Sequence, residues 1–128
     1  MSHFAKEKPF VLVVEDEQLI RMDAVDMVRD LGFEPIEAAN ADHAIAILES
    51  RSDIVAVFTD IQLPGSMDGL RLAAVVKDRW PPVALLVTSG HISPAPSALP
   101  EGARFISKPY VRHELRYHLS ALTGLGSA

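Results

Sequence analysis

The sequence predicts a doubly wound α/β fold, with a five-stranded parallel sheet between helices and a shortened or irregular fourth helix. Two observations lead to this fold class. Short continuous apolar runs, of the kind that form strands buried on both faces, recur along the chain. Amphipathic helical patterns separate these runs, and the alternation is typical of a parallel sheet. Five strands at this spacing, joined by right-handed crossovers, fit the flavodoxin-like order 2-1-3-4-5.

The first half of the chain supplies two strands and two helices. Phe10–Val14 is a continuous apolar run, and the helical pattern that follows it has Gly32 as its stop signal. Glu34–Ala38 is the second, weaker strand. Asn40 or Asp42 can cap the second helix.

The second half supplies three more strands and two long helices. Asp68 precedes the third helix, and we expect its side chain to serve as the cap of that helix. Gly124 is a stop signal after the last helix. The predicted strands are 54–58, 83–87 and 103–106, and the predicted helices are 69–77 and 111–122.

The fourth crossover is the weak point of the pattern. Proline is tolerated in the first turn of a helix but not in its interior. Ser93 could cap a helix whose first residue is Pro94, and Pro96 would still be harmless there. Pro100 would end it. The sequence therefore predicts at most one to two turns in this segment.

Length and composition indicate one globular domain. The chain has 128 residues, of which 48% are hydrophobic and 23% charged, an ordinary globular balance. We expect the domain to span 10–123, with 1–9 as an N-terminal extension and 124–128 as a C-terminal tail. No apolar run approaches the roughly 20 residues that a transmembrane helix needs.

Charge and cysteine content restrict the expected binding partners, the kinds of metal site and the cellular compartment. The formal net charge is −5 and the basic residues are scattered, so we expect no nucleic-acid contact and no membrane contact. The absence of cysteine excludes disulfides and thiolate metal sites. The polar N-terminal residues lack the apolar core of a signal peptide, which predicts a cytoplasmic protein.

Polar residues follow four of the five predicted strands. The carboxyl ends of parallel strands meet at one edge of the sheet, where ligands bind in folds of this type. We therefore expect these side chains to converge. They are Glu15 and Asp16 after the first strand, Asp60 after the third, Thr88 and Ser89 after the fourth, and Lys108 after the fifth.

This set of side chains suits phosphoryl transfer. Three carboxylates close together repel one another, and a divalent cation removes that conflict. Oxygen ligands that leave room for water and phosphate suit Mg²⁺. Asp60 can act as a nucleophile and form an aspartyl-phosphate. Lys108 can neutralise a phosphoryl oxygen, and the Thr88 hydroxyl can donate to another.

Five motifs in order resemble the receiver domain of response regulators, over about residues 10–122. They are Glu15-Asp16-Glu17, Thr59-Asp60-Ile61-Gln62-Leu63-Pro64, Met67-Asp68-Gly69, Val87-Thr88-Ser89-Gly90 and Lys108-Pro109.

The resemblance implies a role for each residue of the set. Asp60 would be the phosphoacceptor, and Asp16 and Asp60 would ligate Mg²⁺ directly. Glu15 would act through water, and the main-chain carbonyl of Gln62 would be a further ligand. The other implied roles are Thr88 as the switch hydroxyl, Phe105 as the switch aromatic, Lys108 as the phosphoryl-binding lysine, and a cis bond between Lys108 and Pro109.

Three departures from the family pattern stand out. The loop after Asp60 is one residue longer, with Gly65 and Ser66 where one residue is common. Phe105 replaces the frequent tyrosine. The fourth crossover is rich in proline, which alters a surface that the family often uses for output.

Each of these residues also has a purely structural interpretation. The pair Glu15-Asp16 could cap the first helix, because acids favour helix N-termini. Thr88 could form a local turn, and Phe105 could be a core aromatic. We interpret His91 as an exposed loop histidine, with a role in dephosphorylation as the alternative.

The resemblance implies a signalling module and not a metabolic enzyme. A sensor histidine kinase or a histidine phosphotransfer protein would donate the phosphoryl group to Asp60. The modified domain would then switch the binding of a downstream protein or relay the group onward. A Mg²⁺-dependent phosphatase is one alternative, although Gln62 stands where such enzymes usually carry a second acid. A pseudo-receiver that binds partners without phosphorylation is the other.

Overall fold

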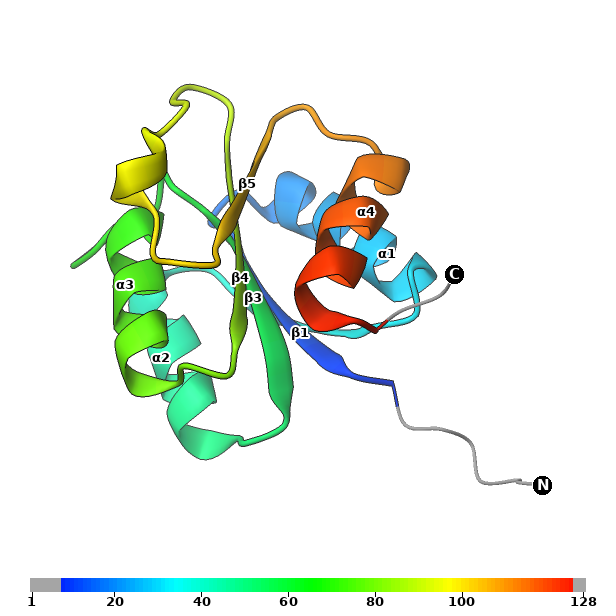
Figure 1. Cartoon of the computed structure of the whole chain (residues 1–128), viewed down its shortest axis with the longest axis horizontal. Coiled ribbons are helices and arrows are strands. Elements are labelled where there is room, and N and C mark those ends of the chain that lie inside the picture. Colours follow the sequence, from blue (N-terminus) through cyan, green and yellow to red (C-terminus); the bar gives the residue numbers. More distant parts are fainter. Residues whose placement is uncertain (1–7, 126–128) are drawn as a thin grey trace.

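The computed structural model describes residues 8–125, and in this part of the chain strands alternate with helices (Figure 1). The predicted number and order of elements are confirmed. The strands are β1 (Phe10–Val14), β2 (Glu34–Ala38), β3 (Ile54–Asp60), β4 (Ala84–Ser89) and β5 (Arg104–Ser107). The helices are α1 (Gln18–Asp30), α2 (Ala41–Ser50), α3 (Gly69–Arg79), α4 (Arg112–Thr123) and the 3₁₀ turn η1 (Pro96–Ala98).

The five strands form one parallel sheet in the order β2-β1-β3-β4-β5, as predicted. Strand β1 lies between β2 and β3, so the order reverses beside β1. The chain passes from β1 outward to β2 and then returns across β1 to form β3 on its other side. The carboxyl ends of β1 and β3 therefore flank the reversal point, where doubly wound sheets bind ligands.

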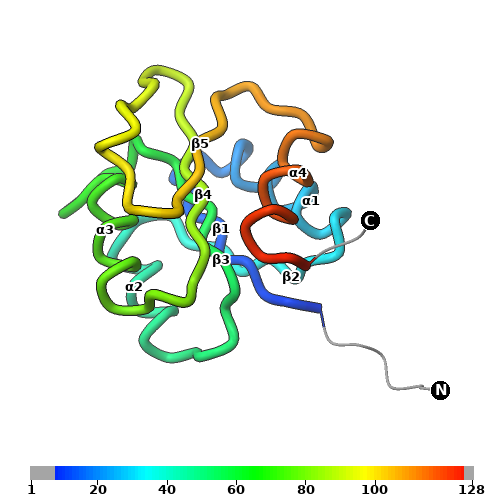
Figure 2. Tube along the Cα trace, viewed as in Figure 1, coloured from blue at the N-terminus to red at the C-terminus, as the bar shows by residue number. Residues whose placement is uncertain are grey.

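Helices cover both faces of the sheet (Figures 1 and 2). Alternate strand residues point to opposite faces, so each strand contributes to two cores. Leu12 and Val57 belong to the core under α2 and α3. Val13 and Leu86 belong to the core under α1 and α4. This double burial accounts for the continuous apolar runs of the strands.

Strands β3 and β4 end two residues later than predicted, and β5 is shifted by one residue. The sequence places the end of β3 at residue 58 and that of β4 at residue 87, but the ladder continues two residues further in each strand. Thr59 pairs with Val87, and Asp60 pairs with Thr88. Asp60, Thr88 and Ser89 are therefore held by the sheet itself and are buried.

The fourth crossover contains a single 3₁₀ turn among the described residues, which agrees with the predicted limit of one to two turns. The predicted start is wrong by two residues. Ala95, and not Ser93, occupies the cap position, and Pro96 is the first residue of the turn. The Ala98 N–H donates to the carbonyl of Ala95 at 2.8 Å, which closes the turn.

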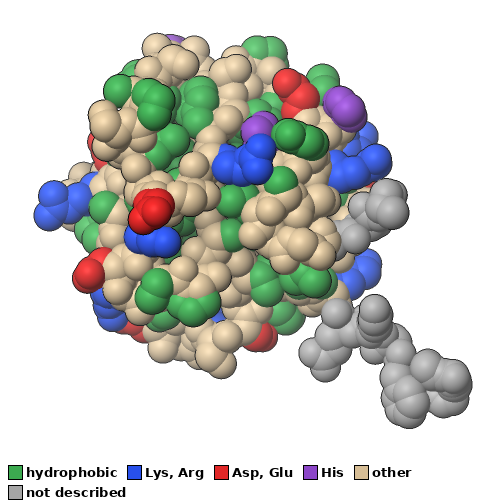
Figure 3. Space-filling view, viewed as in Figure 1, with side chains coloured by type: hydrophobic (Ala, Val, Ile, Leu, Met, Phe, Trp, Pro, Cys, Tyr) green, Lys and Arg blue, Asp and Glu red, His purple; other side chains and the backbone are tan. Residues whose placement is uncertain are grey.

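Residues 8–125 include no helix with both the length and the apolar character needed to cross a bilayer. On the face that Figure 3 shows, Lys and Arg side chains are interspersed with acidic and hydrophobic ones and do not gather into a stripe.

Candidate functional site

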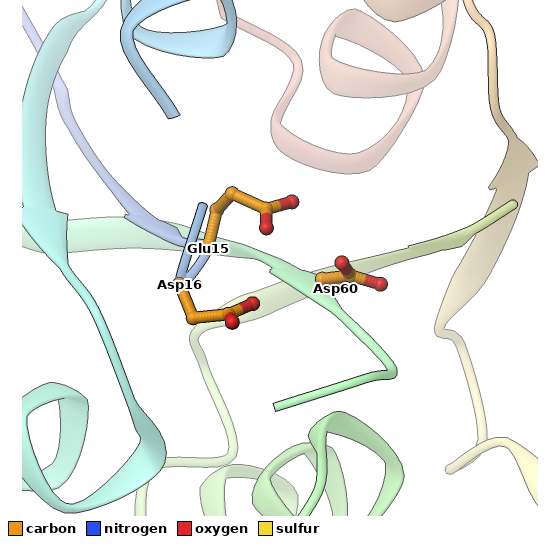
Figure 4. Close-up of side chains that lie close together, drawn as sticks. All are labelled: Glu15, Asp16 and Asp60. Atoms are coloured by element: carbon orange, nitrogen blue, oxygen red, sulfur yellow. The ribbon is translucent and has the colours of Figure 1, made fainter. Parts of the chain in front are cut away.

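The polar side chains at the strand ends converge, as the topology predicts. The side chains of Glu15 and Asp16 extend toward the side where Asp60 lies (Figure 4). Each offers a carboxylate oxygen, and these oxygens all lie within 4.8 Å of one another. The three carboxylates border an open cleft of about 580 Å³ that Lys108 also lines. Such a cleft leaves room for a small ligand between the β1 and β3 ends.

Glu15 follows β1 directly and is only 4% exposed. Its carboxylate accepts hydrogen bonds from the Glu17 N–H at 3.1 Å and from Lys108 Nζ at 2.9 Å. Its own N–H donates to the carbonyl of Ala38 at the end of β2, at 3.0 Å. Burial raises the pKa of Glu15, and the negative charge of Asp60 adds to this effect against the hydrogen bonds from Lys108 and Glu17.

Asp60 is the last residue of β3 and is 5% exposed. One carboxylate oxygen accepts from Lys108 Nζ at 2.9 Å, and the other accepts from the Gln62 N–H at 3.2 Å. Burial alone would lower the pKa of Lys108, but its hydrogen bonds to Asp60 and Glu15 outweigh burial and raise that pKa. The single positive charge of the ammonium group is thus shared between two of the three carboxylates. The Lys108–Pro109 bond is cis, as the resemblance implies.

The chain makes an unusually close approach directly after Asp60. The Gly69 N–H donates to the carbonyl of Ile61 at 2.8 Å, which places the start of α3 against the end of β3. A Cβ atom at position 69 would come within 1.9 Å of the main-chain oxygen of Asp60. Only glycine fits this position. Asp68 caps α3 by accepting from the Arg71 N–H at 2.9 Å, as predicted.

Thr88 pairs with Asp60 in the sheet and is buried, yet its hydroxyl has no hydrogen-bond partner among the described residues. It borders a void of about 10 Å³, together with Phe58 and Tyr110. A buried hydroxyl without a partner is costly, and such groups call for an explanation in function. The hydrogen-bonding capacity of the Thr88 hydroxyl is therefore unused within residues 8–125.

Sequence reasoning missed Tyr110. Its ring packs edge-on against Phe58, with centroids 5.5 Å apart. Burial raises the pKa of Tyr110, and the charges of Glu15, Asp23 and Asp60 add to that effect. The only signal in the sequence is its position two residues after Lys108.

Ser89 joins the end of β4 to the loop after Asp60. Its hydroxyl donates to the side-chain oxygen of Gln62 at 2.9 Å and accepts from the N–H groups of His91 and Ile92 at 3.1 and 3.0 Å. The residue is 1% exposed. The sequence indicates a polar residue here but not this set of bonds, because its partners lie in two separate loops.

The remaining predicted residues are placed as follows. Gln62 and His91 both line the cleft, and His91 is exposed. Phe105 is half-buried and packs against the core under α2 and α3. Ser66, part of the longer loop, donates to Asp42 at the start of α2 at 2.8 Å. The extra residue is therefore anchored to a neighbouring helix.

Comparison with known proteins decides the family. The family model of the response regulator receiver domain matches residues 11–120. The chain belongs to this family. Receiver domains are signalling domains of two-component systems, and the family predicted from the motifs is confirmed.

Relatives and solved structures agree with this assignment. A putative NtrX-like response regulator of Rickettsia bellii (strain RML369-C) is 40% identical over 109 residues, which cover 82% of this chain and 23% of that protein. The crystal structure of NtrX from Brucella abortus is 35% identical with a TM-score of 0.81, covering 92% of this chain and 27% of that one. A receiver protein from Sinorhizobium medicae WSM419 is 26% identical with a TM-score of 0.83, covering 92% and 96%. This chain thus spans about a quarter of the NtrX-type relatives.

Proposed function

We propose that Asp60 accepts a phosphoryl group from a phosphohistidine and that this modification switches or relays a signal. The observation that carries the proposal is the position of Lys108 Nζ, 2.9 Å from both Asp60 and Glu15, at the point where three carboxylates meet. A carboxylate oxygen of Asp60 would attack phosphorus as the bond from phosphorus to the donor imidazole nitrogen breaks. The electron pair of that bond would remain on the imidazole, and Lys108 would neutralise the charge on a phosphoryl oxygen.

The donor set fits a hard divalent cation. Glu15, Asp16 and Asp60 provide only oxygen, and their ligand atoms lie within 4.8 Å of one another. We propose Mg²⁺, with Asp16 and Asp60 as direct ligands, Glu15 acting through water, and the Gln62 carbonyl as a further ligand. The cation would stabilise charge on the transferring group.

The unpartnered hydroxyl of Thr88 supports a role in the response to phosphorylation. This hydroxyl would donate to the phosphoryl group, and its movement would change the packing at the end of β4. Phe105 is the proposed aromatic member of the switch. A sensor histidine kinase or a histidine phosphotransfer protein would be the donor, and a downstream protein would read the new state.

The proposed unit is 10–123, because β1 begins at Phe10 and α4 ends at Thr123. Most of the expected N-terminal extension and C-terminal tail, residues 1–7 and 126–128, lies outside the described residues. The cytoplasmic location and the absence of nucleic-acid and membrane contacts stay predictions.

The test uses intact-mass measurement after incubation with Mg²⁺ and phosphoramidate, which transfers phosphoryl and releases ammonia. We expect wild type to gain one phosphoryl group and Asp60→Asn to gain none. Asp68→Asn is the matched control, since it changes a nearby exposed acid and keeps an N-cap residue. It should be modified like wild type.

The alternative functions predict different results. A pseudo-receiver would show no adduct in any variant. A phosphatase would release phosphate continuously without accumulating the adduct. Modification of Asp60→Asn at the wild-type rate would contradict the assignment of Asp60.

A further inference from the structure

We infer that Arg21 is a positioning residue of the cation site, because its guanidinium holds the peptide group that joins Glu15 to Asp16. The inference rests on the proposed cation site. Arg21 Nη1 donates to the main-chain oxygen of Glu15 at 2.8 Å, and Arg21 Nε donates to Glu37 Oε1 at 2.9 Å. One planar guanidinium therefore bridges the loop after β1 and a side chain of β2.

Helix geometry aims Arg21 at this loop. The Arg21 N–H donates to the carbonyl of Glu17 at 2.9 Å, so the residue belongs to the first turn of α1. Side chains of a helix lean toward its N-terminus, and the β1–α1 loop lies in that direction. The Arg21 side chain is only 17% exposed, whereas that of Glu37 is 51% exposed. Glu37 thus holds the guanidinium from the solvent side.

The bond to Glu15 matters most for Asp16. The N–H and carboxylate of Glu15 are already held by Ala38, Glu17 and Lys108. Asp16 is exposed, so the direction of its carboxylate depends on the backbone that carries it. The carbonyl that Arg21 holds belongs to the peptide plane that leads into Asp16. Arg21 therefore determines how that plane, and the Asp16 Cα, are oriented toward Asp60.

Helix stability does not explain an arginine at this position. A positive charge in the first turn opposes the helix dipole, which favours acids there. The first turn of α1 holds no acidic residue. The favourable contacts of Arg21 are to the loop and to Glu37.

The charge of Arg21 and its hydrogen bonds predict opposite effects on cation binding. A nearby positive charge repels Mg²⁺, so a purely electrostatic role predicts that Arg21→Ala tightens Mg²⁺ binding. A positioning role predicts weaker binding, by about tenfold for loss of an outer-shell partner. Arg21→Lys separates the two, because lysine keeps the charge but replaces the rigid, planar fork of donors with a single nitrogen on a flexible stem.

The experiment titrates the full chain with MgCl₂ and follows backbone amide resonances by NMR. We expect Arg21→Lys and Arg21→Ala to weaken Mg²⁺ binding about tenfold, and Glu37→Gln to weaken it less. We also expect the Asp16 amide resonance to move in both Arg21 variants before any metal is added. The matched control is Arg79→Lys, which alters an arginine–glutamate pair of 2.8 Å at the opposite end of the sheet and should leave Mg²⁺ binding unchanged.

The outcomes separate this inference from the proposed function. If wild type binds Mg²⁺ and Arg21→Lys binds it within twofold, the role of Arg21 is overturned and the cation site stands. Tighter binding by Arg21→Ala also overturns it. If wild type shows no Mg²⁺-dependent shifts at Asp16 and Asp60, the cation site itself fails and this inference fails with it. Urea unfolding of each variant checks that it is folded, and Glu37→Gln provides the test should Arg21→Lys be unstable.

Discussion

The two sides of the site differ in how firmly their residues are held. On the acidic side, Glu15 and Asp60 each accept a bond from Lys108 and one from a backbone N–H. On the β4 side, Thr88 is buried with no partner among the described residues, beside a small void. The crossover that follows β4 is largely exposed and has one 3₁₀ turn.

This difference assigns the two sides different tasks. The acidic side is arranged in advance, so in the proposed function binding a cation or attacking phosphorus would require little rearrangement. The β4 side has a hydroxyl donor without an acceptor and a small void beside it, so in the proposed function a phosphoryl group on Asp60 would change its hydrogen bonding. A two-state response needs a part that can move against a part that does not. Substitutions on the two sides should therefore differ in their effects on stability.

The largest effect is expected at Gly69, on the rigid side. Gly69→Ala would bring a Cβ within 1.9 Å of the Asp60 main-chain oxygen. A strand backbone cannot move aside to relieve this overlap, whereas the end of a flexible side chain could. We expect the free energy of unfolding to fall by about 3 kcal/mol in urea titrations. Gly90→Ala is the control on the β4 side, because its Cβ would be 3.6 Å from Lys108 Cβ, an ordinary contact. Equal losses in the two variants would contradict the comparison.

Ser89 joins the two sides, and Ser89→Ala removes its three hydrogen bonds. Gln62 and the two N–H groups can recover water in the open cleft, so we expect a loss of about 1 to 2 kcal/mol in stability. Amide hydrogen exchange should rise at His91 and Ile92 and stay unchanged at Glu17. Faster exchange at Glu17 as well would mean that the sides are not independent.

Thr88 should show the opposite sign. Thr88→Val replaces a buried hydroxyl that lacks a partner with a methyl group of similar shape. We expect the unmodified protein to gain about 1 kcal/mol in urea titrations, because an unsatisfied polar group is removed from the interior. A loss of stability instead would show that the hydroxyl is satisfied, for example by water in the void.

The smallest effect is expected at His118 on α4, which lies outside the candidate site. Burial lowers the pKa of His118, and the positive charge of Arg104, whose Nε donates to His118 Nδ1 at 3.1 Å, adds to this. A lowered pKa means that the folded protein binds this proton less readily than the unfolded chain does. The associated stability is present above the unfolded pKa, about 6.5, and is lost as the pH falls through the lower folded value.

Urea titrations between pH 7.5 and pH 5 measure this effect. Wild type should lose slightly more stability on acidification than His118→Gln does. Identical pH profiles for wild type and His118→Gln would show that the bond to Arg104 does not bias protonation.

Much of this arrangement follows from sequence because strand ends and topology determine it. Glu15 directly follows one apolar run, and Asp60 lies just after another. These positions predict both where the site lies and that it contains carboxylates. Even so, β3 and β4 extend further than their apolar runs, since main-chain pairing between Asp60 and Thr88 continues whatever the side chains are. Polarity is therefore a poor guide to where a strand ends beside a site.

Side-chain contacts between residues far apart in the sequence could not be predicted. Arg21 and Glu37 are 16 residues apart in the sequence. From sequence alone, an arginine on a helix is interpreted as exposed to solvent, because the pattern does not show that β2 lies beside it. The bond between Ser89 and Gln62 spans 27 residues and depends on side-chain rotamers. Such pairs follow from tertiary geometry, which local pattern does not encode.

The prolines of the fourth crossover have a consequence for recognition. Pro94, Pro96 and Pro100 each have a fixed φ, and Ala95 and Leu99 between them are extended. A partner that binds this segment orders a chain with few conformations to lose, so less of the contact energy is spent on conformational entropy. The prolines also lack N–H donors, which disfavours recognition by strand addition. The segment therefore offers fewer N–H donors to its surroundings than a loop of the same length without proline.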